Sequence, residues 1–358
     1  MQKILLIKTS SMGDVIHNLP VASDIRRAFP QAGIHWVVEE NFAAIAALHP
    51  AVKQLIPVAI RRWRGSWFSS AVRAEKRLFK ERLQQEEYDA VLDTQGLLKS
   101  ALIARHAKGR RCGYAWGSAR EPLAGLFYQD RQTVDTSLHA VERNRLLAAK
   151  CLGYELTEAT DYGIRAPEIG LSWPSGTSPP LPLMEPLTNR LGGQTTPAKS
   201  LVISNSLPQA GERAYAVLLH ATSRADKLWA EANWVDLGRQ LNQAGIVCVL
   251  PWGSDKEKIR SERLANNIPG AVVPPRLSLD QAAALLAGAW VAAGVDTGLS
   301  HFAAALRVPV VGIYCATDPG LTGIYPASGA KAVNLGGTGR PPSVVQVLAA
   351  IEKVCTND

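Results

Sequence analysis

The chain has 358 residues, a formal net charge of +8 and 47% hydrophobic residues. This length predicts about two domains, each with enough apolar material for its own core. The longest apolar stretch, residues 282–295, is too short to cross a bilayer, and the first residues lack the cleavage site of a signal peptide, which argues against membrane-spanning and secreted classes and predicts a cytoplasmic globular protein.

Strands alternate with helical stretches through the first half of the chain, which predicts βαβ units and a mainly parallel sheet. The expected strands cover residues 3–8, 34–39, 54–59 and 90–96. The expected helices cover residues 15–29, 42–48, 70–85 and 98–107.

The first strand runs into a tight turn of small residues, SSMGD, in which Asp14 stands where a helix begins. Ligands of open α/β sheets bind at the carboxyl ends of the strands. The turn is not the dinucleotide fingerprint G-x-G-x-x-G, and its carboxylate would repel phosphate, so a role in proton abstraction is one interpretation. The other is that Asp14 caps the helix, and position alone favours capping at least as much.

The net charge is concentrated in the first half, where residues 1–160 hold 23 Lys or Arg against 16 Asp or Glu. Residues 61–82 form a basic segment with interleaved Trp63, Trp67 and Phe68. Such a segment suits an anionic partner, namely nucleic acid, an acidic glycan or a membrane surface. A solvated amphipathic helix explains it equally well.

The middle of the chain, residues 166–213, contains eight prolines and five glycines. This density predicts a linker with an insertion that has no regular structure. We therefore expect an N-terminal domain over residues 1–165 and a C-terminal domain over residues 214–358, whose final helix could pack back on the N-terminal domain.

The second half repeats the βα alternation and predicts a second Rossmann-like unit. Its expected strands cover residues 215–220, 245–252, 271–274, 291–296 and 308–314. Its expected helices cover residues 231–244, 254–267, 278–289 and 297–306.

Polar residues follow two of these strands. The turn HATSRADKLW offers Thr222, Ser223 and Lys227, whose hydroxyls and ammonium match phosphate oxygens. Glu257 follows the next strand, where an acid can bind ribose hydroxyls. An ordinary surface turn is the alternative for both segments.

The stretch VDTGLSHF places Asp296 at a strand end and opens a helix at Thr297 and Gly298. Free amide groups and the helix dipole at such a start favour a diphosphate. Asp296 and His301 would then contact the remaining polar groups of the ligand, although an ordinary helix cap is equally compatible with the pattern.

No motif for a metal ion, a Walker lysine or a nucleophilic serine is present, so we expect neither a metal nor a cofactor. Five cysteines stand apart without a C-x-x-C pair, which predicts reduced thiols rather than a zinc site or a disulfide framework. They are Cys112, Cys151, Cys248, Cys315 and Cys355.

Taken together, KTSSMGD, RRWR, DTQG, AREPL, HATSRADKLW, PWG and DTGLSH resemble the ADP-heptose glycosyltransferase family of lipopolysaccharide core synthesis, over nearly the whole chain apart from the proline-rich segment. The resemblance implies a GT-B fold, in which two Rossmann-like α/β domains face each other across a cleft. It also implies metal-independent, inverting transfer of heptose from ADP-heptose to a Kdo residue of Kdo-lipid A, by an enzyme peripheral to the cytoplasmic face of the inner membrane.

Carried over position by position, the resemblance implies that Asp14 is the catalytic base and that Lys227 assists the leaving diphosphate. The residues implied for the donor are Thr222, Ser223, Lys227, Glu257, Asp296, Thr297, Gly298 and His301. The residues implied for the acceptor are Lys8, Ser11, Arg61, Arg64 and Arg120. The chain departs from the family at Gly65, where a lysine is frequent, and in its longer linker.

Three alternatives remain open at this point. A second heptosyltransferase or another sugar-nucleotide transferase of the same family shares the Gly-Asp turn. A noncatalytic protein could use the basic segment to bind nucleic acid or a membrane surface, although charge alone predicts only nonspecific nucleic-acid binding. A nicotinamide-dependent oxidoreductase lacks the glycine fingerprint it would need.

Overall fold

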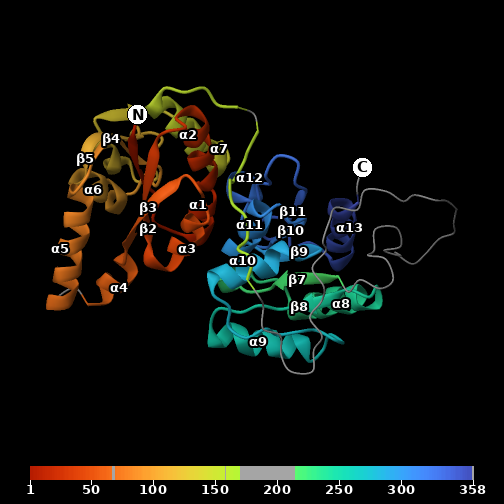
Figure 1. Ribbon diagram of the computed structural model, residues 1–358. Helices are drawn as coiled ribbons and strands as arrows, with labels where there is room; N and C mark the ends of the chain where they lie inside the picture. Colours follow the sequence, from red (N-terminus) through yellow and green to blue (C-terminus); the bar gives the residue numbers. More distant parts are fainter. Residues whose placement is uncertain (67–68, 158, 170–213, 357–358) are drawn as a thin grey trace. The chain divides into compact units, whose positions relative to one another are not determined.

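The computed structural model describes residues 1–66, 69–157, 159–169 and 214–356 (Figure 1). Most of the expected linker, together with Trp67 and Phe68, therefore lies outside the described residues. The chain forms two compact units. The first comprises Met1–Pro167 with Gly320–Gly329, and the second comprises Glu168–Pro319 with Ala330–Asp358.

The first unit is built on a six-stranded parallel sheet in the order β3-β2-β1-β4-β5-β6. This is the Rossmann strand order. The strands are β1 (Lys3–Ile7), β2 (Gly33–Glu39), β3 (Val52–Val58), β4 (Glu87–Asp93), β5 (Lys108–Tyr114) and β6 (Asp130–Gln132). The four expected strands are confirmed, and β5 and β6 are additional.

Helices cover both faces of this sheet. They are α1 (Met12–Ile16), α2 (Leu19–Ala28), α3 (Ala43–Ala47), α4 (Ile60–Gly65), α5 (Ser70–Gln84), α6 (Leu98–His106) and α7 (Ala140–Leu152), with 3₁₀ turns η1 (Glu40–Phe42) and η2 (Pro122–Phe127). The single helix expected over residues 15–29 is wrong, because the chain breaks at His17 and Asn18. Pro20 lacks the N–H that would continue the first helix and stands instead in the first turn of α2.

The second unit is built on a five-stranded parallel sheet in the order β11-β10-β9-β7-β8. Its strands are β7 (Tyr215–Leu219), β8 (Val247–Val249), β9 (Val291–Val295), β10 (Val310–Tyr314) and β11 (Ala332–Gly336). The strand expected at residues 271–274 is reduced to one bridge between Val249 and Val272. The two parallel α/β sheets confirm the expected fold class.

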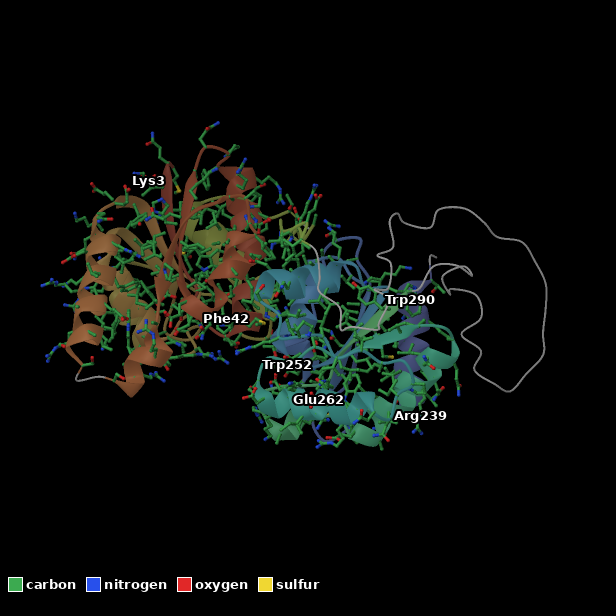
Figure 2. The ribbon with its side chains drawn as sticks, turned by 60° about the horizontal axis from the view of Figure 1, so that its bottom comes forward. Lys3, Phe42, Arg239, Trp252, Glu262 and Trp290 are labelled. Atoms are coloured by element: carbon green, nitrogen blue, oxygen red, sulfur yellow. A yellow bond between two sulfur atoms is a disulfide. The ribbon has the colours of Figure 1, made fainter. Side chains whose placement is uncertain are left out.

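The helices of the second unit are α8 (Glu231–Gln243), α9 (Asp255–Ala265), α10 (Leu279–Ala287), α11 (Gly298–Ala305), α12 (Pro319–Thr322) and α13 (Val344–Cys355), with the 3₁₀ turn η3 (Ala225–Lys227). The final helix, α13, places Val347, Leu348 and Ile351 in the core of this unit with side chains of β7 and β9. Helix α13 therefore belongs to the second unit, and its packing against the N-terminal domain stays a prediction. Figure 2 shows the side chains, with Arg239 and Glu262 on the surface of this unit.

Two cysteines correct the expectation of reduced thiols. Cys112 on β5 and Cys151 on α7 form a disulfide with a Cα–Cα distance of 6.0 Å. The two residues stand 39 positions apart in the sequence, so only the packing of α7 beside β5 brings them together. Cys248, Cys315 and Cys355 are free.

A buried ion pair joins α2 to α7. The Arg145 guanidinium lies 2.7 Å from Asp24, and their side chains are 6% and 3% exposed. Arg145 also donates to the carbonyl oxygens of Thr157 and Ala159, each at 3.0 Å. It therefore holds the chain that follows α7 against the first unit.

We expect Asp24→Ala to lower the free energy of unfolding by about 3–5 kcal/mol, because Arg145 would stay buried without its carboxylate. The matched control is Glu81→Ala, which removes an exposed partner of Arg77 on α5. It should change the free energy of unfolding by less than about 0.5 kcal/mol. Urea unfolding followed by circular dichroism measures both. Equal midpoints for the two variants would contradict the prediction.

Candidate functional site

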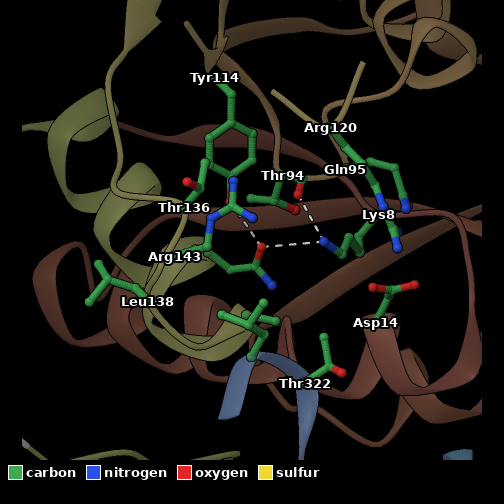
Figure 3. Close-up of a pocket in the computed structure, with 13 residues that line it drawn as sticks. Lys8, Asp14, Thr94, Gln95, Tyr114, Arg120, Thr136, Leu138, Arg143 and Thr322 are labelled. Atoms are coloured by element: carbon green, nitrogen blue, oxygen red, sulfur yellow. Dashed lines mark hydrogen bonds between the residues drawn. The ribbon is translucent and has the colours of Figure 1, made fainter. Parts of the chain in front are cut away.

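A pocket of about 220 Å³ lies in the first unit, at the carboxyl ends of β1, β4 and β5 (Figure 3). Three of its lining residues were predicted from the sequence, namely Lys8, Asp14 and Arg120. The others were not: Thr94, Gln95, Tyr114, Thr136, Leu138, Ala140, Arg143, Asn144, Leu321 and Thr322. Ser11, Arg61 and Arg64 are not among the described residues that line it.

The position of Asp14 agrees with both interpretations of it, a helix cap and a carboxylate that faces a ligand site. Helix α1 begins at Met12 after the N-cap Ser11, and the Asp14 carboxylate Oδ2 accepts hydrogen bonds from the Ser11 N–H at 2.7 Å and the Ser11 hydroxyl at 3.0 Å. The same carboxylate faces the pocket beside Lys8 and Arg120 (Figure 3). Oδ1 has no hydrogen bond to any described residue, so capping leaves one oxygen for a ligand.

Gln95 holds this first turn against the end of β4. Its Oε1 accepts from the backbone N–H groups of Thr9 at 2.9 Å and Ser10 at 3.2 Å, and its Nε2 donates to the Ser10 carbonyl at 2.6 Å. Three bonds from one buried side chain fix the backbone just before α1. The position of Asp14 therefore depends on the DTQG turn as well as on its own.

Lys8 is 5% exposed, and its Nζ donates to the Thr94 carbonyl at 2.8 Å and to Asn144 Oδ1 at 3.3 Å. Burial lowers the pKa of Lys8 to about 8, while the negative charges of Asp14 and Asp93 oppose that change. The nearby charges of Arg120 and Arg143 lower it further. Near neutral pH this pocket thus holds several cations beside one facing carboxylate, which favours an anionic ligand.

Arg61 and Arg64 lie on α4. A lysine that the sequence reasoning missed, Lys99, contacts the first turn and is affected by the charge of Arg64. Lys99 Nζ donates to the Ser10 hydroxyl at 3.0 Å. Burial lowers the pKa of Lys99, and the charge of Arg64 lowers it further. Lys99 follows the DTQG turn by a few residues, and this proximity was the signal that could have identified it.

In the second unit Asp296 gathers the predicted donor residues. Its Oδ2 lies 2.6 Å from Lys227 Nζ and accepts from the Thr317 hydroxyl at 2.8 Å. The Thr222 hydroxyl donates to the Asp296 carbonyl at 3.0 Å, and His301 Nε2 lies 4.0 Å from Oδ1. The sequence therefore identified this cluster except for Thr317, which follows the neighbouring strand β10.

Helix α11 begins beside this cluster. Thr297 is its N-cap, its side chain makes no capping bond, and Gly298 is the first helical residue. The amide groups of such a first turn have no partners within the helix. A binding role for them stays a prediction.

Thr222, Ser223 and Glu257 line a second pocket, of about 470 Å³, in this unit. Glu257 Oε2 accepts from the N–H groups of Gly253 at 2.7 Å and Ser254 at 3.2 Å, so it caps α9, and a ribose contact stays a prediction. The pocket also holds three cationic side chains that were not predicted: Lys256, Arg260 and Arg263.

Neither a membrane helix nor a metal cluster is found in the described parts of the chain. No helix there is long and apolar enough to span a bilayer. Across residues 1–169 and 214–356, apart from the few left undescribed, no group of His, Cys, Asp and Glu side chains is arranged to hold a metal ion.

The chain has two Rossmann-like units. One carries an acid in its first turn, and the other brings a lysine, hydroxyls and a helix start together, which is the arrangement expected of a two-domain glycosyltransferase. The model of glycosyltransferase family 9 (heptosyltransferase) matches residues 76–347. The chain belongs to this family and is an enzyme of the heptosyltransferase type.

Individual relatives agree with this assignment. Lipopolysaccharide heptosyltransferase 1 of Escherichia coli K12 is 44% identical over 90% of this chain and 91% of its own length. The protein of the same name from Pseudomonas aeruginosa is 41% identical over 99% and 87%. Lipopolysaccharide heptosyltransferase 2 of E. coli is a more distant match, with 25% identity over 89% and 84%.

Among solved structures, E. coli heptosyltransferase WaaC with ADP superimposes with a TM-score of 0.80 and 40% identity, covering 98% of this chain and 99% of that chain. WaaC with ADP-2-deoxy-2-fluoro heptose gives a TM-score of 0.78 and 39% identity over the same shares. The similarity therefore extends over both units.

We expect the Lys8 ammonium to lose its proton with a midpoint near pH 8 instead of the ordinary 10.5. Because the folded-state pKa is lowered, the charge is present below that midpoint and lost above it. NMR titration of the lysine Cε resonances measures this, with Lys8→Met identifying the signal. A Lys8 midpoint at the ordinary value would contradict the prediction.

Proposed function

We propose that the chain transfers heptose from ADP-heptose to the Kdo residue of a Kdo-lipid A acceptor, with inversion at the anomeric carbon. The observation that carries this proposal is the 40% identity with WaaC over 98% of the chain, in a structure that contains ADP. The more distant match to heptosyltransferase 2 disfavours the second enzyme of the family.

The acceptor site in this proposal is the pocket of the first unit. Its cations, Lys8, Arg120 and Arg143, suit the carboxylate of Kdo. Asp14 takes the proton of the acceptor hydroxyl while the hydroxyl oxygen bonds to the anomeric carbon. The bond from that carbon to the diphosphate breaks in the same step, and this single displacement inverts the configuration.

The donor site is the cluster around Asp296. Thr222, Ser223, Lys227 and the first amide groups of α11 bind the diphosphate, whose negative charge grows as ADP leaves. In the present structure Lys227 pairs with Asp296. The donor phosphate therefore has to share or replace that partner.

One assay tests the function directly. The protein is incubated with ADP-heptose and Kdo-lipid A, and the lipid product is analysed by mass spectrometry beside reactions with ADP-glucose and UDP-glucose. Addition of one heptose unit from ADP-heptose supports the proposal. Transfer from another nucleotide sugar would assign a different transferase. Transfer only to lipids that already bear a heptose would do the same.

We expect Asp14→Asn to lower kcat by about 100- to 10,000-fold, because the amide cannot accept the proton. Its side-chain oxygen can still accept the Ser11 bonds, so α1 and ADP binding should persist within about twofold, as calorimetry can verify. The control is Glu142→Gln, the same exchange in the capping box of α7. Near-normal turnover of Asp14→Asn would refute the role of a base.

We further propose that α4 and α5 attach the enzyme to the anionic cytoplasmic face of the inner membrane, where the lipid acceptor resides. Arg62 is paired with Glu40 at 3.1 Å and with Glu75 at 2.9 Å. Arg61 and Arg64 have no carboxylate within ion-pair distance among the described residues. Their charges are thus available to lipid phosphates.

The double variant Arg61→Gln/Arg64→Gln should bind vesicles with one quarter phosphatidylglycerol about 30-fold more weakly, since each basic residue near such a surface contributes about 1 kcal/mol. The control, Lys53→Gln/Lys108→Gln, removes the same charge at the amino ends of β3 and β5. Vesicle flotation measures both. Equal losses would show that net charge alone acts.

A further inference from the structure

The last residue of β2 and the residues just after it contact helix α4 in three ways. Glu39 Oε1 accepts a hydrogen bond from the backbone N–H of Arg61 at 3.0 Å. Glu40 pairs with the side chain of Arg62. The Phe42 ring lies 5.2 Å from the guanidinium carbon of Arg61. The end of β2 thus determines where the basic helix lies.

Among these contacts only that of Glu39 reaches the helix backbone from a buried position. Glu39 is 1% exposed, and its own N–H donates to the Thr9 carbonyl at 3.0 Å, beside the first turn. The N-cap of α4 is Ala59, which has no side-chain oxygen to cap the helix. Glu39 therefore supplies from another element the cap that α4 lacks.

The second oxygen of Glu39, Oε2, is buried and has no hydrogen-bond partner among the described residues. A buried carboxylate is unfavourable unless positive charge compensates it. Lys99 supplies such charge. Burial, and after it the charge of Arg64, lowers the pKa of Lys99, and the Glu39 carboxylate opposes this lowering. Glu39 and Arg64 thus act on the pKa of Lys99 in opposite directions.

We propose that Glu39 is the positioning residue of the basic helix α4, and that its hydrogen bond to the Arg61 N–H holds Arg61 and Arg64 where they meet the phosphates of the lipid acceptor at the membrane surface. The part concerning the acceptor rests on the proposed function. Glu39 does not contact the reacting atoms in this assignment. It acts on acceptor affinity through the placement of α4.

Two conservative variants separate the hydrogen bond from the charge. Glu39→Gln keeps the length and an accepting oxygen but loses the charge. Glu39→Asp keeps the charge but is one methylene shorter and withdraws from the Arg61 N–H. We expect Glu39→Asp and Glu39→Ala to raise the KM for Kdo-lipid A about tenfold. Loss of a helix cap costs on the order of 1 kcal/mol, and a cost of that size in acceptor binding corresponds to about tenfold in affinity.

The other kinetic parameters should stay nearly constant. We expect kcat and the KM for ADP-heptose to change less than about twofold in Glu39→Asp. We expect Glu39→Gln to keep the acceptor KM of the wild type. Glu40→Gln is the matched control, because it alters an exposed ion pair beside the same helix. Impairment of Glu39→Gln with a normal Glu39→Asp would overturn the proposal, as would equal effects on both substrates.

Amide hydrogen exchange of residues 59–66 provides a readout that does not depend on transfer. Exchange there should be faster in Glu39→Asp and unchanged in Glu39→Gln. A wild-type protein that transfers no heptose would refute the proposed function, whereas unchanged exchange in Glu39→Asp and Glu39→Ala would refute the positioning role. If Glu39→Ala does not fold, the Asp and Gln pair still decides.

Discussion

The parallel pairing of β1 with both β2 and β4 is the constraint on which the candidate acceptor site depends. Residues Ile4–Ile7 are fully buried and pair on both sides, and parallel strands deliver their carboxyl ends to one edge. The turns after the three strands therefore meet. The turn after β1 carries Asp14, β2 ends at Glu39, and the turn after β4 carries the Gln95 side chain that clamps the first turn.

Much of this arrangement could be predicted from the sequence because the central strands are continuous apolar runs. The missed strands are weaker in this respect. β5, KGRRCGY, is half exposed over its first residues, and β6 has only three residues, so neither produces an apolar run. Helix α7 was not predicted, although its ends carry sequence signals, since His139 and Glu142 form a capping box before it and Gly153 ends it in the left-handed conformation.

The site was predictable where one turn carries it and not where distant segments meet. Asp14, Lys227 and Asp296 each lie in a turn with recognisable composition. The partners of Lys8 are Thr94 and Asn144, which stand 86 and 136 positions away. Thr94 lies in the DTQG motif, but nothing in the local sequence indicates that it or Asn144 accepts a hydrogen bond from Lys8. The Cys112–Cys151 disulfide was not predicted for the same reason, because it depends on the packing of α7 against β5.

The cations of the first unit contact neutral oxygens, whereas Lys227 of the second unit contacts a carboxylate. This difference affects which anionic ligands each unit favours. Lys8 donates to neutral oxygens of Thr94 and Asn144, and Arg143 to the Ser118 carbonyl, so an anion there adds charge pairing without breaking any. Lys227 already pairs with Asp296. A ligand in the second unit has to compete with a carboxylate, which disfavours weakly charged ligands and favours a diphosphate whose negative charge exceeds that of the acid it displaces.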